Sequence, residues 1–233
     1  FLECKPVKGL VELNKNITKN KNDIPKSLAE FLAIESKVTI AIQGPPGTGK
    51  SSVTAKLVVE LLKLDKKIAI SSNSNQAINN LLLKTKIVCQ DQELDVEIIK
   101  ATSNKKDAEL SEKGISLIPP KFLTLDERVV GGTTWIFSRE EMEKAFDFLI
   151  IDEAGQMSLA NLMVISRCAK SILLVGDQQQ LSQPLQAKHS WGADLSSLEY
   201  WLSKQKVVPN DKGVFLTKSW RMHPNITSIC LLY

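Results

Sequence analysis

One segment restricts the fold of this 233-residue chain more than any other, the octapeptide Gly-Pro-Pro-Gly-Thr-Gly-Lys-Ser at residues 44–51. It fits the pattern G-x-x-x-x-G-K followed by Ser or Thr, and it lies between a β-branched apolar run and a segment with helical periodicity. Glycines let the backbone approach an anion, the helix N-terminus attracts it, the lysine neutralises phosphate oxygens and the serine hydroxyl can bind Mg²⁺. A plain Gly/Pro surface turn is the alternative, and the strand-before, helix-after context disfavours it. The sequence predicts a phosphate-binding loop formed by Gly44, Pro45, Pro46, Gly47, Thr48, Gly49, Lys50, Ser51 and Ser52.

Short apolar runs rich in β-branched residues recur along the chain, at residues 38–42, 68–70, 96–99, 146–151 and 172–175. They are continuous rather than alternating, which is typical of strands buried on both faces of a parallel sheet. Segments with helical periodicity lie between them, at residues 51–64, 75–86 and 159–169. The alternation predicts a doubly wound α/β domain, a parallel sheet with helices on both faces, whose functional loops follow the carboxyl ends of the strands.

The amino-acid composition excludes several classes of protein. The chain is 43% hydrophobic and 24% charged with a net charge of +4, which is in the globular range and excludes disorder and fibrous repeats. This mild basicity permits nucleic acid as a ligand without arguing for it. The four cysteines lie far apart and only two histidines are present, so we expect reduced thiols and no zinc site. No apolar run reaches the roughly 18 residues of a membrane span and no signal peptide is evident, so we expect a soluble protein.

Two carboxylates, Asp152 and Glu153, end the apolar run at residues 146–151. Beside a phosphate loop, the first acid would hold Mg²⁺ and the second would activate the attacking water as a general base. The alternative is a helix cap at the end of a strand. The run at residues 172–175 leads into a glutamine-rich segment containing Gln180, where a neutral amide could sense a γ-phosphate. A solvated loop is the alternative for that segment.

Four segments together resemble, in order and spacing, motifs I to IV of superfamily 1 helicases, namely residues 43–51, 152–156, 176–184 and 219–224. The combination is most similar to the up-frameshift-like branch of that superfamily. Residues 71–77 and 129–133 match, more weakly, its motif Ia and its strand-end threonine motif. Residues 132–137 and 152–161 are similar to the helicase half of nuclease–helicase fusions whose N-terminal half is RecB-like.

This resemblance implies a P-loop NTPase with a RecA-like fold, and it assigns roles by motif position. Lys50, Ser51 and Asp152 would bind ATP and Mg²⁺, and Glu153 would activate water. Gln180 would couple the state of the γ-phosphate to movement. Arg221 would reach the γ-phosphate from across an interdomain cleft, although an ordinary surface arginine is the alternative.

Three small polar residues, Ser74, Asn75 and Thr133, correspond to positions that touch the backbone of a single strand in relatives. Hydroxyl and amide groups suit phosphate contacts that do not read sequence. A capping or core role is the alternative for each of them. Trp135 could stack on a base. Because it directly follows a strand pattern, we expect instead that it packs in the core.

The resemblance also implies how the chain is divided. Residues 1–37 would be a linker and lead-in, residues 38–213 a first motor domain, and residues 214–233 the start of a truncated second motor domain. Residues 87–128 read as an irregular insertion in the first domain. Because the chain begins with Phe1 and stops within an amphipathic segment, we interpret it as a piece of a longer protein.

We therefore expect an ATP-dependent helicase or translocase motor domain that acts on single-stranded DNA or RNA within a larger nuclease–helicase protein. Its expected partners are a second RecA-like domain and a nuclease domain in cis, and no membrane. The expected location is the cytoplasm, with the nucleoid if the source is bacterial or archaeal. The alternatives are an ATPase switch that regulates a protein partner without unwinding, and a non-catalytic nucleic-acid-binding module. By itself, this piece should hydrolyse ATP slowly or not at all.

Overall fold

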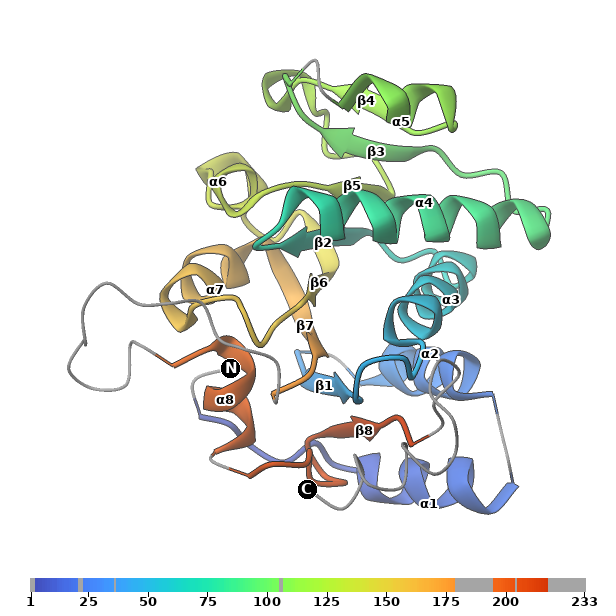
Figure 1. The fold of residues 1–233 in the computed structure, drawn as a ribbon, viewed down its shortest axis with the longest axis vertical. Helices are drawn as coiled ribbons and strands as arrows, with labels where there is room; N and C mark the ends of the chain where they lie inside the picture. The colour runs from blue at the N-terminus through green and yellow to red at the C-terminus, as the bar shows by residue number, and fades with distance from the viewer. Residues whose placement is uncertain are drawn as a thin grey trace.

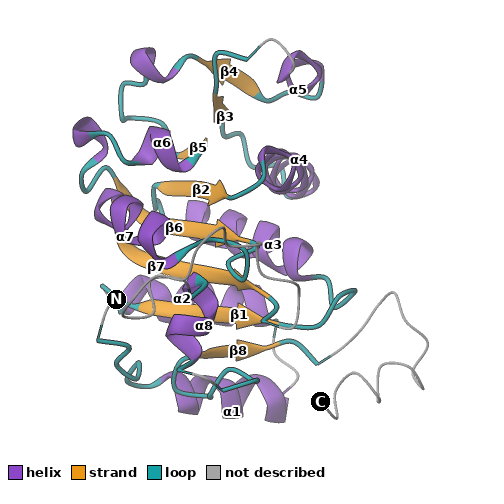
Figure 2. Cartoon of the chain, turned by 60° about the vertical axis from the view of Figure 1, so that its left-hand side comes forward, coloured by secondary structure: helices purple, strands orange, loops and turns teal. Residues whose placement is uncertain are grey.

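The computed structural model describes residues 3–20, 23–35, 37–104, 107–178, 195–203 and 205–217. These residues form an eight-stranded sheet in which every pairing is parallel. Its strand order is β4-β3-β5-β2-β6-β7-β1-β8 (Figure 2). The strands are β1 (Thr39–Gln43), β2 (Ile68–Ser72), β3 (Ile98–Ala101), β4 (Ser116–Ile118), β5 (Val129–Gly131), β6 (Phe146–Asp152), β7 (Ala169–Gly176) and β8 (Gly213–Phe215). The predicted parallel α/β architecture is confirmed.

Helices cover both faces of the sheet, as Figures 1 and 2 show. The helices that pack into one core are α1 (Leu10–Asn20), α2 (Ile24–Ile34), α3 (Lys50–Lys63), α4 (Asn75–Asp91) and α5 (Ala108–Glu112). Those of the opposite core are α6 (Thr134–Phe137), α7 (Leu159–Ile165) and α8 (Ser197–Leu202). Neighbouring residues of one strand divide between the two cores: Ile150 of β6 packs into the first and Leu149 and Ile151 into the second. This division explains why the strand sequences are apolar without alternation.

The helix predicted at residues 159–169 is too long. In the structure α7 ends at Ile165, a 3₁₀ turn covers Ser166–Cys168, and β7 begins at Ala169. Ala169 pairs with Phe146 at the start of β6, so the chain must leave the helix early to enter the sheet. Within the described part of the chain, no helix is long and apolar enough to cross a membrane.

The segment at residues 1–37 is more ordered than a linker. Its described residues contain two helices, α1 and α2, where a linker and lead-in were expected. Leu10 and Leu28 are fully buried in the first core. Asn14 Nδ2 donates hydrogen bonds of 2.9 Å to the carbonyl oxygens of Asn210 and Gly213, so α1 also binds the far end of the described chain.

Two further segments extend the sheet at its edges. Residues 87–128 are not irregular throughout, because β3 pairs with β5 and β4 pairs with β3. At the other edge, β8 pairs with β1, so the first sheet continues past residue 213. Gln43 reinforces this edge: its Nε2 donates to the carbonyl oxygen of Lys206 (2.8 Å), and its Oε1 accepts from the backbone N–H of Val208 (2.6 Å). A domain boundary at residue 214 would therefore cut through β8, which pairs with β1 of the first sheet.

Candidate nucleotide site and nucleic-acid edge

The phosphate-binding loop connects β1 to α3, as the sequence predicts. Gly47 and Gly49 have φ values of +85° and +78°, which lie in the left-handed region that favours glycine. Thr48 closes the loop internally, since its Oγ1 donates a 2.8 Å hydrogen bond to the carbonyl oxygen of Pro45. Gly49 is the N-cap residue of α3. Because it has no side chain, no side-chain cap occupies the free N–H groups at the start of the helix. This arrangement presents backbone N–H groups to an anion.

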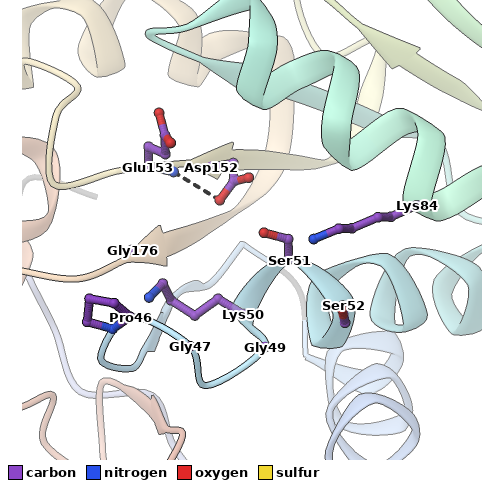
Figure 3. A pocket seen from close by; sticks show the side chains of 10 residues that line it. All are labelled: Pro46, Gly47, Gly49, Lys50, Ser51, Ser52, Lys84, Asp152, Glu153 and Gly176. Carbon is purple, nitrogen blue, oxygen red and sulfur yellow. Dashed lines mark hydrogen bonds between the residues drawn. The ribbon is translucent and has the colours of Figure 1, made fainter. Parts of the chain in front are cut away.

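Lys50, the first residue of α3, folds its side chain back over the loop (Figure 3). Its Nζ donates hydrogen bonds to the carbonyl oxygens of Gly44 (2.5 Å) and Pro45 (3.1 Å). Burial lowers the pKa of Lys50, while the carboxylates of Asp177 and Asp152 act in the opposite direction. The ammonium group is therefore held by carbonyl oxygens inside the site. Phosphate oxygens of a bound ligand could replace these carbonyl oxygens as hydrogen-bond acceptors.

The acidic pair lies at the carboxyl end of β6, where the sequence places it. β6 is not adjacent to β1, because β7 runs between them and ends at Gly176. A Cβ at Gly176 would lie 3.2 Å from the backbone nitrogens of Ala154 and Gly155, so a glycine allows the two chain segments to come this close. The two predicted motifs thus meet across a middle strand rather than on neighbouring strands.

Asp152 and Glu153 have different environments. Asp152 is buried, and this burial raises its pKa to about 6, with the nearby Glu153 carboxylate adding to the effect. The backbone N–H of Glu153 donates to Asp152 Oδ1 (3.0 Å) and, together with Lys84 and Lys50, favours the charged form. Glu153 is only half-buried, and its φ of +55° turns the chain sharply at the end of the strand. A buried acid beside a more accessible one suits metal binding and proton transfer respectively.

These residues line one pocket of about 550 Å³ (Figure 3). Ten residues form its walls: Pro46, Gly47, Gly49, Lys50, Ser51, Ser52, Lys84, Asp152, Glu153 and Gly176. Gly44, Pro45 and Thr48 shape the loop but do not line the pocket. The volume is in the range of about 300–1,000 Å³ that is common for small-molecule sites.

Lys84 is a pocket residue that the sequence analysis missed. It projects from the middle of α4 and extends toward Ser51 (Figure 3). An exposed lysine in a helix is usually a solvated surface residue, and the sequence contains no signal that would distinguish this one. Its proximity to the acidic pair nevertheless favours the charged form of Asp152. Gln180 and Arg221, the two remaining predicted catalytic residues, lie outside the described residues.

The three predicted nucleic-acid contacts lie at the same edge of the sheet, after β2 and β5. These strands are parallel neighbours with Ile70 opposite Gly131, which brings Thr133 level with the end of β2. Ser74 caps α4, because its side chain accepts from the backbone N–H of Ala77 (3.4 Å). Asn75 is the first residue of α4 and is exposed. The capping interpretation is therefore correct for Ser74, whose hydroxyl hydrogen can still be donated.

Trp135 does not pack in the core, contrary to expectation. Its side chain is 84% exposed, while the following Ile136 and Phe137 are buried in the second core. The short helix α6 turns the chain immediately after Thr133, and one turn cannot bury all of its faces. An exposed indole beside Thr133 is available to a ligand at the carboxyl edge of the sheet.

Comparison with known proteins defines the class of this chain. A family model described as an AAA domain matches residues 26–191, and the chain belongs to this family. The chain is 29% identical over 215 residues to "DNA replication ATP-dependent helicase/nuclease DNA2" of Bos taurus, covering 88% of this chain and 20% of that protein. It is 26% identical over 257 residues to "DNA-binding protein SMUBP-2" of Mesocricetus auratus, covering 87% of this chain and 26% of that protein.

Among solved structures, the complex of the Arterivirus nonstructural protein 10 helicase with DNA gives a TM-score of 0.49 at 15% sequence identity. That match covers 88% of this chain and 40% of the viral one. The family and the curated relatives confirm the predicted class, a superfamily 1 helicase motor domain of the RecA-like P-loop kind. The printed names of the two relatives describe an ATP-dependent helicase/nuclease and a DNA-binding protein. The chain spans only about a fifth to a quarter of the length of the two curated relatives.

Proposed function

We propose that this chain is the first motor domain of an enzyme that hydrolyses ATP to move on single-stranded DNA or RNA. One observation carries the proposal. The phosphate-binding loop and the acidic pair share one pocket, and this pocket lies at the same sheet edge as the polar residues that follow β2 and β5. In doubly wound α/β sheets, this edge is where ligands bind.

The donors and acceptors of the pocket fit a nucleoside triphosphate with Mg²⁺. Lys50 and the N–H groups of the loop would bind phosphate oxygens, and Ser51 with Asp152 would hold the metal ion. The ion would neutralise charge that develops on the phosphates. Glu153 would take the proton of the attacking water, a role that its more accessible position supports. Gln180 and Arg221 remain the proposed γ-phosphate sensor and charge-stabilising arginine.

We propose that a single strand follows the carboxyl edge of the sheet past β2 and β5. Thr133 and the amide of Asn75 would donate to phosphate oxygens, and these contacts would tolerate any sequence. The exposed indole of Trp135 would stack on a base, since aromatic platforms bind unpaired bases irrespective of sequence. DNA is favoured over RNA as the substrate by the printed names of the relatives.

The larger assembly is also part of the proposal. A second RecA-like domain would follow β8 and complete the ATPase site, and a nuclease domain would lie elsewhere in the same protein, as the name of the Bos taurus relative suggests. We propose a cytoplasmic location, with the nucleoid in a bacterial or archaeal cell.

The test is ATP hydrolysis by the longest form of the protein that contains this chain, with and without single-stranded DNA. Stimulation by the strand, abolished in Lys50→Ala and retained in Lys56→Ala, is the expected result. Lys56 is a matched control because it lies on the exposed side of the same helix. If only single-stranded RNA stimulates hydrolysis, the substrate of the motor is RNA rather than DNA. Hydrolysis that is indifferent to both nucleic acids would contradict a motor and favour the ATPase switch.

A further inference from the structure

A buried lysine lies behind the proposed nucleic-acid edge. Lys100, on β3, is only 1% exposed, which is rare for a lysine. Its Nζ donates a 2.9 Å hydrogen bond to Oδ1 of Asn75. Asn75 itself is exposed at the start of α4. The contact therefore links a charge in the protein interior to a surface amide at the sheet edge.

The surroundings keep this lysine charged. Burial lowers the pKa of Lys100 to about 8, and the nearby carboxylate of Asp107 acts in the opposite direction. Asp107 is also buried, and it is fixed by the Oγ1 of Thr102 (2.7 Å) and the Nδ2 of Asn79 (3.3 Å), which both donate to it. A buried ammonium is costly, and an apolar residue of similar length would fill the same space. The hydrogen bond to Asn75 and the nearby carboxylate of Asp107 offset part of this cost.

The chemistry of the contact determines which way the amide faces. An ammonium group only donates hydrogen bonds, so it can bind only the oxygen of an amide. Lys100 thereby fixes Oδ1 of Asn75 toward the interior, and the NH₂ group, which carries the two donors, points away from it. A phosphate oxygen only accepts hydrogen bonds. The orientation fixed by Lys100 is the one that a phosphate requires.

We propose that Lys100 is a positioning residue for nucleic-acid binding: it holds Asn75 so that the amide NH₂ group donates to a backbone phosphate of the bound single strand. The inference rests on the proposed function and adds to it a residue without contact to the strand. The matching ligand is any phosphodiester backbone, since no base is read. Lys100 also adds a positive charge behind the contact.

The experiment is a double-mutant cycle on single-strand affinity. Binding of a fluorescent oligothymidylate is measured by anisotropy at one fixed salt concentration, on wild type, Lys100→Met, Asn75→Ala and the double variant. Each single variant should bind about tenfold more weakly, the range expected for one hydrogen bond to a charged group. The double variant should be no weaker than the weaker single variant, because both remove the same contact. Lys56→Met, which loses an exposed charge of α3, should bind as wild type.

Two results would overturn the inference: wild-type affinity in Lys100→Met, or losses that multiply in the double variant. Asn75→Asp keeps an oxygen for Lys100 but removes the NH₂ donors at an exposed position, so it remains informative if Lys100→Met does not fold. It should lose at least as much affinity as Asn75→Ala, and unchanged affinity would also overturn the inference. Absence of single-strand binding by wild type itself would instead overturn the proposed function.

Discussion

The buried ammonium of Lys100 should make the stability of the chain depend on pH in a way that one substitution removes. In the unfolded chain, the pKa of this lysine is near its ordinary value of 10.5, whereas burial lowers it to about 8 in the native state. Between these two values the unfolded state binds more protons than the native state. The free energy of unfolding therefore rises with pH across this window.

The size of the effect follows from the two pKa values. Linkage between pH 7 and pH 9.5 gives a gain of about 2 kcal/mol in the free energy of unfolding from this one group. Lys100→Met removes the titrating group while keeping a side chain of similar length. The variant should therefore be more stable than wild type near pH 7, and the difference between the two should shrink by about 2 kcal/mol toward pH 9.5.

Urea unfolding followed by tryptophan fluorescence at several pH values between 7 and 9.5 measures both curves. Lys56→Met should follow the wild-type curve, because its removal changes only an exposed charge. If the free energies of unfolding of wild type and Lys100→Met differ by the same amount at every pH, Lys100 is not a buried titrating group with a lowered pKa. If Lys100→Met is less stable at pH 7, the lysine contributes packing or hydrogen bonds that outweigh its burial cost.

Four further changes test other parts of the structure. Glu153→Gln should lower kcat at least about 100-fold with nucleotide affinity retained in calorimetry, since only the proton acceptor is lost; normal turnover would remove Glu153 from the mechanism. Lys84→Met should weaken Mg-ATP binding about two- to fivefold, the scale of one exposed charge, and unchanged affinity would show that this lysine only borders the pocket. Trp135→Ala should weaken single-strand binding about fivefold or more without changing the thermal midpoint, because the indole is 84% exposed; a loss of stability would indicate a packing role instead. Gly213→Ala should lower the free energy of unfolding by about 1–3 kcal/mol in urea, since its Cβ would overlap the carbonyl oxygen of Ala41 across β8 and β1; wild-type stability would contradict this strand pairing.

Strands buried on both faces were predictable because burial requires apolar residues at nearly every position. β1, β6 and β7 each contain a largely apolar run, and their ends lie within one to three residues of the predicted bounds. β8 and β4 have only three residues each, too few for any period to be visible. α1 buries a single stripe of its surface and is otherwise rich in Lys and Asn, so its sequence resembles a linker. These elements form only because β1, β3 and α2 provide partners for them.

The residues of the candidate site also fall into a predictable and an unpredictable group. The phosphate-binding loop and the acidic pair were predictable because their chemistry requires particular residues at fixed spacing along the chain. Lys84 and Lys100 carry no such spacing, and their environments depend on how α4 and β3 pack. The exposure of Trp135 depends on where the single turn of α6 lies relative to the second core. Residues whose role depends on packing between distant segments could not be recognised from their neighbours in the sequence.

Helix α4 connects the two proposed ligand sites. It begins at Asn75, whose amide accepts a hydrogen bond from Lys100 at the sheet edge, and nine residues later it carries Lys84, which lines the nucleotide pocket. At 1.5 Å per residue the two positions are about 14 Å apart along the helix axis. α4 also packs against α3, which starts at Lys50, the proposed phosphate ligand. Asn75 and Lys84 thus lie on one helix, which runs from Asn75 to Asp91. A shift of α4 against α3 would displace both residues together, so a change at one proposed site that moved this helix would also alter the other.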